Sequence, residues 1–455
     1  MNSIKRVLIA NRGEIAVRII RTCKRLGIET VLAASEADLQ SLAARLADKV
    51  VCIGPARSAE SYLNVDKVVA AAIKVEADAL HPGYGFLSEN KRLAAACAEA
   101  GVLFIGPTVE QLDAVGDKLK ARANALAAGL PVVPGGEVNC LADAQVLIGQ
   151  VGCPALIKAV GGGGGRGMKR VYEVEKLEET IELAIAEAQA AFGDPRVYLE
   201  RFVTSGRHVE VQVLGDGEQV IHLGTRDCSV QRRYQKLVEE APAPLLSEEL
   251  RESMHQAAVA FAKYLKYRGL GTVELLVDCE RETFYFLEMN ARIQVEHPVT
   301  EAICGLDLVA EQIAVAEGRP LTISQEQVHF LGHAIECRIN AEDWSRDFQP
   351  CPGSVKRVVF PAGAGIRVDT HLQRGSKVPP FYDSLVAKLI VHGNSREDAL
   401  QRLRSALAVC RIEGITTNLP MHAALMEDAG FSIGGVDTAY FTQFLELATK
   451  EVTHG

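Results

Sequence analysis

The sequence predicts a protein of mixed α/β and α+β class with about three domains. Its 455 residues correspond to roughly three domains at the common size of about 150 residues each. In the first quarter, apolar runs alternate with stretches of helical period, which is typical of a doubly wound parallel sheet. Later stretches alternate polar and apolar residues with a period of two, which indicates strands. The N-terminal part therefore differs in architecture from the remainder.

Composition excludes several classes of protein. Hydrophobic residues make up 48% and charged residues 24% of the chain, as in a globular rather than a disordered or fibrous protein. A net charge of −9 provides no overall positive field for nucleic acid or an anionic membrane. No run approaches the roughly 18 apolar residues of a membrane span, and the N-terminal apolar run is too short for a signal peptide. The 11 cysteines form no Cys-x-x-Cys pair, so we expect reduced thiols and a cytoplasmic location.

The N-terminal region contains a strand, a helix and a second strand, and this order occurs twice. The predicted strands are short apolar runs, and the helices carry apolar residues with a period near 3.6. The two units are residues 6–10, 14–26 and 30–34, and then residues 77–80, 88–100 and 102–105.

A glycine-rich loop, Gly161 to Gly167, lies between predicted strands 155–160 and 168–172. Residues without a Cβ let backbone N–H groups close around phosphate oxygens. The loop leads into a strand and is not followed by Gly-Lys-Ser/Thr, so neither a dinucleotide fingerprint nor a P-loop applies. A flexible linker is the alternative. The flanking Lys158 and Lys169 favour a flap over a triphosphate.

Three further elements follow from pattern. A helix over 177–192 ends at Gly193, and a strand over 208–213 alternates His, Glu and Gln with valines, which predicts a half-buried strand. In the C-terminal region we expect a strand over 334–340 and a helix that Ser395 caps.

The segment from Thr272 to His297 predicts a hairpin that carries carboxylates. If Asp278 lies opposite Phe284, Glu274 lies opposite Glu288, with Cβ atoms about 5 Å apart. Two carboxylates placed so closely repel each other unless a cation lies between them.

Oxygen ligands from Glu274, Glu288 and Asn290 suit a hard ion, Mg²⁺ or Mn²⁺, of the kind that bridges nucleotide phosphates. The alternative is an outward, solvated face, which is usual for glutamates on strands. The polar pattern continues at Arg292, Gln294 and Glu296, which favours a site.

The segment 226–236, RDCSVQRRYQK, carries four basic residues. By itself this pattern indicates a solvated charge run. Beside a nucleotide site, the same cations would bind an anionic substrate.

These segments, taken in order, resemble the biotin carboxylase family, ATP-grasp enzymes that form the biotin-carboxylating component of acetyl-CoA and related carboxylases. The resemblance covers nearly the whole chain. Its matching stretches are ANRGEIAVRI (10–19), HPGYGFLSEN (81–90), GDK (116–118), IKAVGGGGGRGM (157–168), RHVEVQVL (207–214), RDCSVQRR (226–233), EEAPAP (239–244), EMNARIQVEHPVTE (288–301), ECRINAED (336–343) and VPPFYDSL (378–385).

The resemblance implies three domains: a preATP-grasp domain over 1–115, an ATP-grasp domain over 116–330 with a flap subdomain at about 130–205, and a C-terminal domain over 331–447. It implies ATP-dependent carboxylation of biotin by bicarbonate, through carboxyphosphate, as the first half-reaction of acetyl-CoA carboxylase in fatty acid synthesis. The implied cofactors are ATP and two Mg²⁺ or Mn²⁺ ions, with biotin as a carrier-bound substrate. The implied partners are a biotin carboxyl carrier protein, carboxyltransferase subunits and a second copy of the chain.

The resemblance also implies a role for each matching residue. Bicarbonate would bind Lys236, Arg292 and the Val295 backbone, Glu296 would be the general base, and Arg338 would meet the biotin ureido oxygen. The family usually has His or Asn where Tyr234 stands, and this position lines the nucleotide site. Metals would bind Glu274, Glu288 and Asn290, and ATP would bind Lys118, Lys158, Gly164, Gly165, Glu200, Arg201, Phe202, Val203, His208, Tyr234, Glu274 and Glu288.

Two other functions remain open at this stage. A different ATP-grasp ligase, which joins a carboxylate to an amine, would share the flap and the metal hairpin. A nucleotide-binding regulatory subunit without turnover is the other, and only Tyr234 supports it. The one Met-Lys pair, Met168-Lys169, lies in the glycine-loop block, so we expect no covalent biotin on this chain and a separate carrier.

Overall fold

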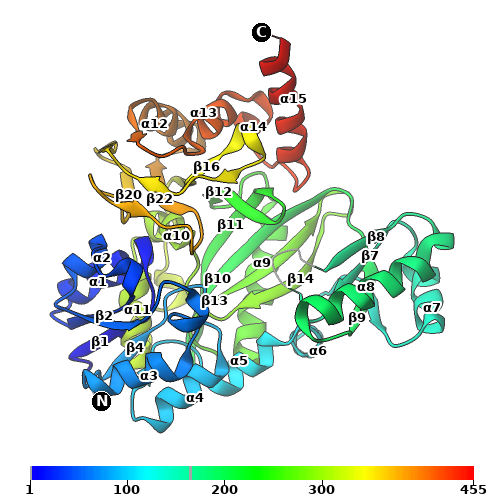
Figure 1. Cartoon of the computed structure of the whole chain (residues 1–455). Coiled ribbons are helices and arrows are strands. Elements are labelled where there is room, and N and C mark those ends of the chain that lie inside the picture. Colours follow the sequence, from blue (N-terminus) through cyan, green and yellow to red (C-terminus); the bar gives the residue numbers. More distant parts are fainter. Residues whose placement is uncertain (1–2, 163–166, 455) are drawn as a thin grey trace.

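The N-terminal region folds around a parallel sheet with the strand order β3-β2-β1-β4-β5. Side chains of β1 alternate between two apolar cores, with Val7 and Ile9 facing α1 and Leu8 facing the opposite side. This arrangement confirms the predicted doubly wound domain, which is blue in Figure 1. Its elements are β1 (Arg6–Ile9), α1 (Gly13–Arg25), β2 (Glu29–Ser35), β3 (Lys49–Gly54), α3 (Val65–Lys74), β4 (Ala79–His81), α4 (Lys91–Glu99) and β5 (Leu103–Phe104).

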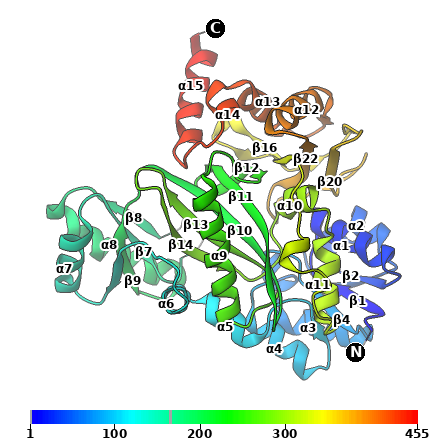
Figure 2. The ribbon, with the colours of Figure 1, turned by 180° about the vertical axis from the view of Figure 1, so that it is seen from behind.

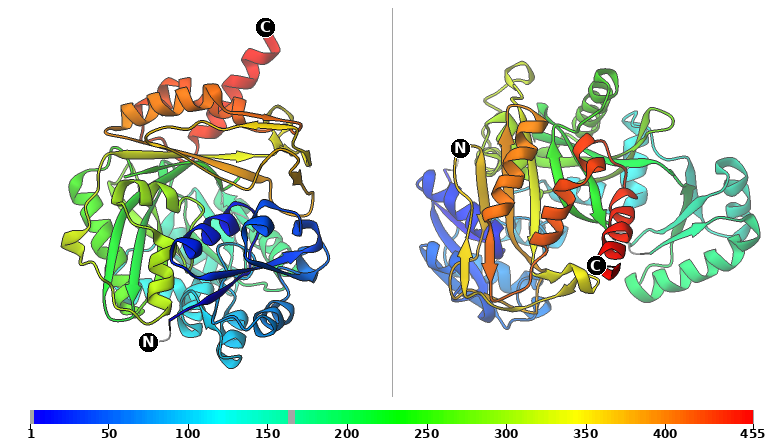
Figure 3. Two further views of the ribbon diagram at one scale, coloured as in Figure 1. Left: turned by 90° about the vertical axis from the view of Figure 1, so that its left-hand side faces the viewer. Right: turned by 90° about the horizontal axis from the view of Figure 1, so that it is seen from above.

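The computed structural model describes residues 3–162 and 167–454. Within it, a lobe with its own four-stranded sheet, of order β6-β9-β7-β8, projects from the rest of the molecule (Figures 1 and 3). Its helix α8 ends where Gly193 takes a left-handed conformation with φ +71°, as the sequence predicts. The lobe comprises β6 (Gly135–Val138), α7 (Leu141–Val151), β7 (Ala155–Ala159), β8 (Met168–Val171), α8 (Leu177–Phe192) and β9 (Val197–Arg201). Gly164 and Gly165 lie outside the described residues.

An eight-stranded sheet of order β14-β13-β10-β11-β12-β15-β22-β20 forms the centre of the molecule. Strand β12 pairs with β15 through Val238 and Cys337. The boundary predicted near residue 330 therefore separates strands of one continuous sheet. The strands are β10 (Gly206–Asp216), β11 (Val220–Arg232), β12 (Gln235–Ala241), β13 (Arg268–Asp278), β14 (Thr283–Asn290), β15 (His333–Asn340), β20 (Ile366–Thr370) and β22 (Leu385–Gly393).

Helix α9 (Glu248–Tyr264) covers one face of this sheet, as Figure 2 shows. Its Met254 and Phe261 pack against Val209 and Val211 of β10. The prediction that β10 is half-buried is wrong, because Glu210 and Gln212, on the opposite face, are also 0% exposed. Strand β10 lies inside the sheet, and its polar face meets other polar side chains rather than water.

The hairpin of β13 and β14 brings Glu274 opposite Glu288, as predicted. The register assumed at its far end is wrong, because Asp278 pairs with Thr283 and not with Phe284. A bulge between Glu274 and Leu275 absorbs the one-residue difference, because a bulge adds one residue to one strand only.

The second hairpin strand also ends earlier than predicted, at Asn290, and helix α10 (His297–Cys304) begins shortly after it. The remaining helices pack on the C-terminal part of the sheet, and the Ser395 side chain caps α12 by accepting a hydrogen bond from the Asp398 backbone, as expected. They are α12 (Arg396–Val409), α13 (Leu419–Glu427), α14 (Ala429–Ile433) and α15 (Tyr440–His454). Over the described residues, no helix combines the length and apolar character needed to cross a bilayer.

Candidate active site

Lys236 lies at the centre of a cluster of carboxylates on the central sheet. Its Nζ is 2.7 Å from Glu210 Oε2, 2.7 Å from Glu296 Oε1 and 3.1 Å from Glu274 Oε1. Burial by itself lowers the pKa of Lys236, but the surrounding Cys228 and the three carboxylates hold it well above its ordinary value. The ammonium group is therefore charged and fixed in position.

Glu296 lies between two cations. One carboxylate oxygen accepts from Lys236, and the other accepts from Arg338 Nη2 at 2.9 Å. Glu296 is 0% exposed, and burial alone would raise its pKa, but Lys236, Arg338 and Arg226 hold the pKa well below the ordinary value. Glu296 is therefore ionised and held in place by a cation on each oxygen, and it is positioned to accept a proton although the same cations lower its basicity.

Arg226 is a second buried cation beside this cluster, and it holds Glu210 in place. It is 0% exposed, and it donates to Glu210 Oε1 at 2.6 Å, to Gln212 at 2.7 Å and to Thr300 at 2.9 Å. Interpreting the whole basic segment as a solvated charge run is therefore wrong. Only residues 233–235 are exposed, where Arg233 forms an ion pair with Asp347 at 3.1 Å.

Arg292 extends from the loop after β14. Its guanidinium donates to Glu89 Oε2, to Asn290 Oδ1 and to Gln294 Oε1, each at 3.0 Å. Glu89 stands in the HPGYGFLSEN stretch, so the N-terminal domain also contributes to the site. The sequence analysis assigned no role to Glu89 or Glu210, although both lie in stretches that match the family, whereas it counted Gln294 in the polar pattern that favours a site.

The predicted metal ligands lie together on the hairpin. Asn290 Nδ2 donates to Glu288 Oε1 at 3.2 Å, and Glu274 lies directly across from Glu288. Burial and the neighbouring Glu274 raise the pKa of Glu288, and within residues 3–162 and 167–454 no cation forms an ion pair with it. A buried carboxylate without a paired cation, beside oxygen donors, fits a hard divalent ion.

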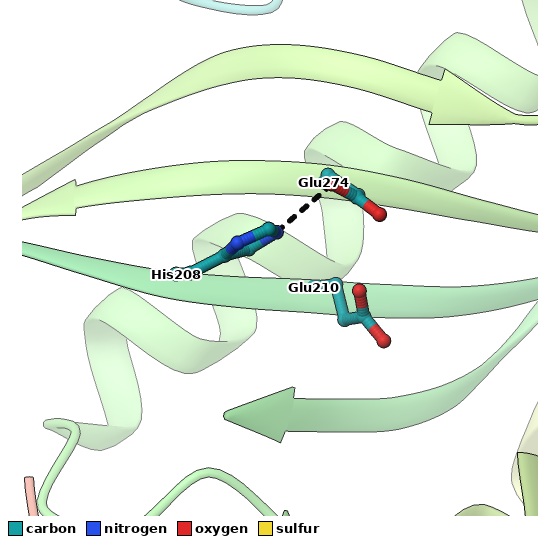
Figure 4. Close-up of side chains that lie close together, drawn as sticks. All are labelled: His208, Glu210 and Glu274. Carbon is teal, nitrogen blue, oxygen red and sulfur yellow. Dashed lines mark ion pairs between the residues drawn. The ribbon is translucent and has the colours of Figure 1, made fainter. Parts of the chain in front are cut away.

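A second group of possible ligands, His208, Glu210 and Glu274, lies beside these residues (Figure 4). His208 Nε2 is 2.9 Å from Glu274 Oε2. The ammonium of Lys236 already binds both Glu210 and Glu274. This group therefore has its cation from the protein itself. Glu274 belongs to both groups, so of the two facing hairpin carboxylates, Glu274 and Glu288, only Glu288 lacks an ion-pair partner among the described residues.

The residues predicted to bind the nucleotide line the junction of the lobe and the sheet. Lys158 forms an ion pair with Glu200 at the end of β9. Burial lowers the pKa of Lys158, but Glu200, Tyr198 and Glu288 outweigh this and raise it. The negative charge of Glu288, on the β13–β14 hairpin, thus acts on Lys158 of the lobe. Lys118 also lies in the field of Glu288, although burial dominates and lowers its pKa.

The other predicted nucleotide contacts are in two places. Arg201 and Phe202 donate backbone hydrogen bonds to Pro134 and Pro154, which fixes the segment that ends at Val203. Tyr234 lies outside the buried part of the site, because it is 49% exposed at the turn between β11 and β12. Its backbone has a left-handed φ of +66°.

Models of known families match three consecutive parts of the chain. The model described as Biotin carboxylase, N-terminal domain, matches residues 3–112. The model described as Carbamoyl-phosphate synthase L chain, ATP binding domain, matches residues 117–324. The model described as Biotin carboxylase C-terminal domain matches residues 336–443.

The chain is 49% identical over 444 residues to Biotin carboxylase 1 of Bacillus subtilis, a match that covers 97% of this chain and 99% of the relative. It is 46% identical over 442 residues to a pyruvate carboxylase component of Methanothermobacter thermautotrophicus, a match that covers 96% of this chain and 90% of the relative.

The structure is similar to that of a biotin carboxylase–β,γ-ATP complex from Campylobacter jejuni, with a TM-score of 0.94, 46% identity and coverage of 97% and 99%. It is also similar to the biotin carboxylase domain dimer of the Hydrogenobacter thermophilus 2-oxoglutarate carboxylase with MgADP, ADP and bicarbonate, with a TM-score of 0.92, 44% identity and coverage of 97% and 98%. The three consecutive domain matches, the identity across nearly the whole chain and the shared fold show that the chain belongs to the biotin carboxylase family, ATP-dependent carboxylases of the ATP-grasp ligase class.

Proposed function

We propose that the protein carboxylates biotin held on a carrier protein, with bicarbonate as the carbon source, as the first half-reaction of acetyl-CoA carboxylase. The observation that carries the proposal is Glu296, a fully buried carboxylate whose two oxygens accept hydrogen bonds from Lys236 and Arg338. Lys236 acts in the first chemical step, on bicarbonate, and Arg338 acts in the second, on biotin.

In the first step, bicarbonate binds to Lys236, Arg292 and the Val295 backbone, and Glu296 accepts its proton. The freed oxygen attacks the γ-phosphate of ATP, and ADP leaves, which forms carboxyphosphate. Lys118, Lys158, Gly164 and Gly165 bind the phosphates, and positive groups stabilise the charge that spreads over the transferring phosphoryl oxygens.

The adenosine part of ATP binds at Glu200 to Val203, His208 and Tyr234. The hairpin residues Glu274, Glu288 and Asn290 would hold two Mg²⁺ or Mn²⁺ ions, which neutralise phosphate charge when bound.

In the second step, carboxyphosphate breaks down to CO₂ and phosphate. The phosphate takes the proton from the ureido nitrogen of biotin, and that nitrogen then attacks CO₂. Arg338 stabilises the negative charge that develops on the ureido oxygen. Atoms and charges balance across both steps: ATP, bicarbonate and biotin give ADP, phosphate, carboxybiotin and one proton, which Glu296 took from bicarbonate and then releases to solvent.

The carrier lysine is expected on another protein. Lys169, of the Met-Lys pair, lies on β8 and forms an ion pair with Glu187 at 2.7 Å. A lysine on a paired strand does not suit a swinging arm. We further propose a homodimer in the cytoplasm, three domains over 1–115, 116–330 and 331–447 with the flap subdomain at about 130–205, and partnership with carboxyltransferase subunits. The eleven cysteines are all free, which supports a reducing compartment.

The decisive experiment is ATP hydrolysis by the purified protein with bicarbonate, with and without free biotin. We expect hydrolysis that depends on bicarbonate and rises with biotin. A ligase that joins a carboxylate to an amine would not respond to biotin, and a regulatory subunit would hydrolyse nothing.

The acceptor is tested separately with biotinylated carriers from acetyl-CoA, pyruvate and 2-oxoglutarate carboxylases. We expect the acetyl-CoA carboxylase carrier to have the highest kcat/KM. Preference for another carrier would contradict that part of the proposal alone.

A further inference from the structure

Lys388 is a fully buried lysine that the proposed mechanism does not use. It lies on β22 directly opposite Arg338 of β15 and is 0% exposed. Its Nζ donates to the carbonyl oxygen of Val295 at 2.7 Å, and it forms an ion pair with Glu14 Oε1 at 3.1 Å. The C-terminal part of the chain therefore contacts the backbone residue that precedes Glu296.

Glu14 extends this contact into the N-terminal domain. It lies in the first turn of α1 and is 2% exposed. The hydroxyl of Tyr84 donates to the same Glu14 oxygen that Lys388 binds. Asn11 in turn holds the Tyr84 loop, because its Nδ2 donates to the carbonyls of Pro82 and Tyr84 at 2.7 Å each. The stretches ANRGE and HPGYGF thus meet Lys388 behind the site.

Two neighbouring cations of the C-terminal part therefore bind consecutive residues. Arg338 binds the Glu296 carboxylate, and Lys388 binds the Val295 carbonyl. Because the peptide group is planar, a fixed Val295 carbonyl also fixes the plane that leads to the Glu296 Cα. Glu296 is the N-cap of α10, but its side chain makes no capping hydrogen bond, so helix capping does not orient it.

Stability alone does not explain a lysine at this position. A buried ion pair contributes little that a well-packed apolar pair would not. An apolar pair, however, has no N–H group to donate to the Val295 carbonyl. Lys388 also lies in the field of the buried Glu336 and Asp369, so its charge is balanced by carboxylates from several elements.

We propose that Lys388 is a positioning residue for the bicarbonate step: through the Val295 carbonyl it sets the backbone that presents Glu296 and the Val295 amide to bicarbonate. The inference rests on the proposed function. It predicts that loss of the Lys388 hydrogen bond impairs use of bicarbonate and leaves ATP binding intact, because the nucleotide residues lie on other elements.

The test compares Glu14→Gln with the double variant Glu14→Gln/Lys388→Met. Lys388→Met alone would leave Glu14 buried without its cation. We expect this single variant to fold poorly, and it serves only to show that effect. The double variant removes one positive and one negative charge together, so it leaves the net charge of the buried region unchanged. Glu14→Gln alone removes the ion pair and retains the Lys388 hydrogen bond to Val295.

We expect the double variant to unfold near the wild-type midpoint and to lose about a hundredfold in kcat/KM for bicarbonate, the scale of a misplacement of about 1 Å. The KM for ATP should change by less than about twofold. Glu14→Gln should retain bicarbonate kinetics within about threefold of wild type.

Two results would overturn the proposal: wild-type bicarbonate kinetics in the folded double variant, or an equal loss in Glu14→Gln. If the double variant does not fold, a loss of bicarbonate kinetics in Glu14→Gln still overturns the proposal, because this variant retains the Lys388 hydrogen bond to Val295. Failure of the proposed function is distinguishable, since the unmodified protein would then lack hydrolysis that depends on bicarbonate.

Discussion

Arg338→Gln should separate the two chemical steps. Arg338 donates to Glu239 Oε1 at 2.5 Å and to Glu296 Oε2 at 2.9 Å. The substitution removes the donor proposed for the ureido oxygen and one of the two cations on Glu296. Lys236 still holds the other Glu296 oxygen.

The two losses differ in size. Removal of one donor to a developing oxyanion costs about 10²- to 10³-fold in rate, so biotin carboxylation should fall by that amount. Loss of one cation from Glu296 is worth about 4 kcal/mol if the charge centres are about 4 Å apart and the effective dielectric constant is about 20, which is about three pKa units. Since the pKa of Glu296 starts well below its ordinary value, this rise leaves the carboxylate mostly ionised at about pH 8.

Glu239, the second carboxylate bound by Arg338, further limits the loss of ATP cleavage in Arg338→Gln. Burial raises the pKa of Glu239 to about 7, so this carboxyl can take up a proton when Arg338 is gone. We expect the rate of ATP cleavage with bicarbonate but without biotin to fall by only about tenfold at pH 8. The acid limb of the pH–rate profile of this reaction should shift to higher pH.

The assay measures ADP release at about pH 8 with and without biotin, and repeats the second measurement across pH. Arg396→Gln is the matched control. Arg396 forms a comparable ion pair, 2.7 Å from Nε to Glu240 Oε2, one residue from Glu239, and it does not face Glu296. It should leave both activities near wild type. Equal losses in the two Arg338→Gln activities, or an unmoved acid limb, would refute the reasoning.

Three further predictions follow from the site and the core. Glu288→Gln should abolish ATP hydrolysis at saturating Mg²⁺ while circular dichroism and the melting temperature stay within error of those of the exposed control Glu282→Gln; an unchanged rate would exclude Glu288 as a metal ligand. Burial lowers the pKa of His422 from 6.5 to about 4, so its neutral form stabilises the fold above pH 6.5 and this contribution is lost as pH falls towards 4. At about 1.36 kcal/mol per unit the loss is roughly 3 kcal/mol, and His422→Gln should reduce, by this amount, the fall in the free energy of urea unfolding between about pH 7 and pH 4.5; a slope equal to wild type would contradict this. Intact-mass measurement of the protein from its own cells should show no biotin adduct, and a stoichiometric adduct would contradict the expectation of a separate carrier.

Local patterns in the sequence determined much of the architecture. The apolar periods predicted the β1–α1–β2 unit, and the end of α8 at Gly193 followed from its position after an amphipathic stretch. The period of two predicted Glu274 opposite Glu288, but the register assumed at the far end of the hairpin is wrong, and the pairing depends on the bulge between Glu274 and Leu275. These features depend on neighbours within about 25 residues, where chain geometry leaves few alternatives.

The resemblance of ordered stretches then named the family and the residue roles, which no single pattern carried. Tyr234 shows where such reasoning ends. The resemblance implies that Tyr234 lines the nucleotide site, and in the structure the Tyr234 side chain is about half exposed at a turn. Its contact with ATP remains a prediction.

Only the tertiary structure decided which polar groups are buried together. Arg226 belongs to a run that looks solvated in the sequence, yet it is 0% exposed and bound to Glu210. The contacts of Lys388 with Val295 and Glu14 join residues that are 93 positions apart in one case and belong to different domains in the other. The alternation of residues along a strand predicts on which face of the sheet a side chain lies. The order of strands in the sheet determines which other side chains it contacts there. That order is set by apolar packing over the whole chain, and a single segment therefore does not contain it.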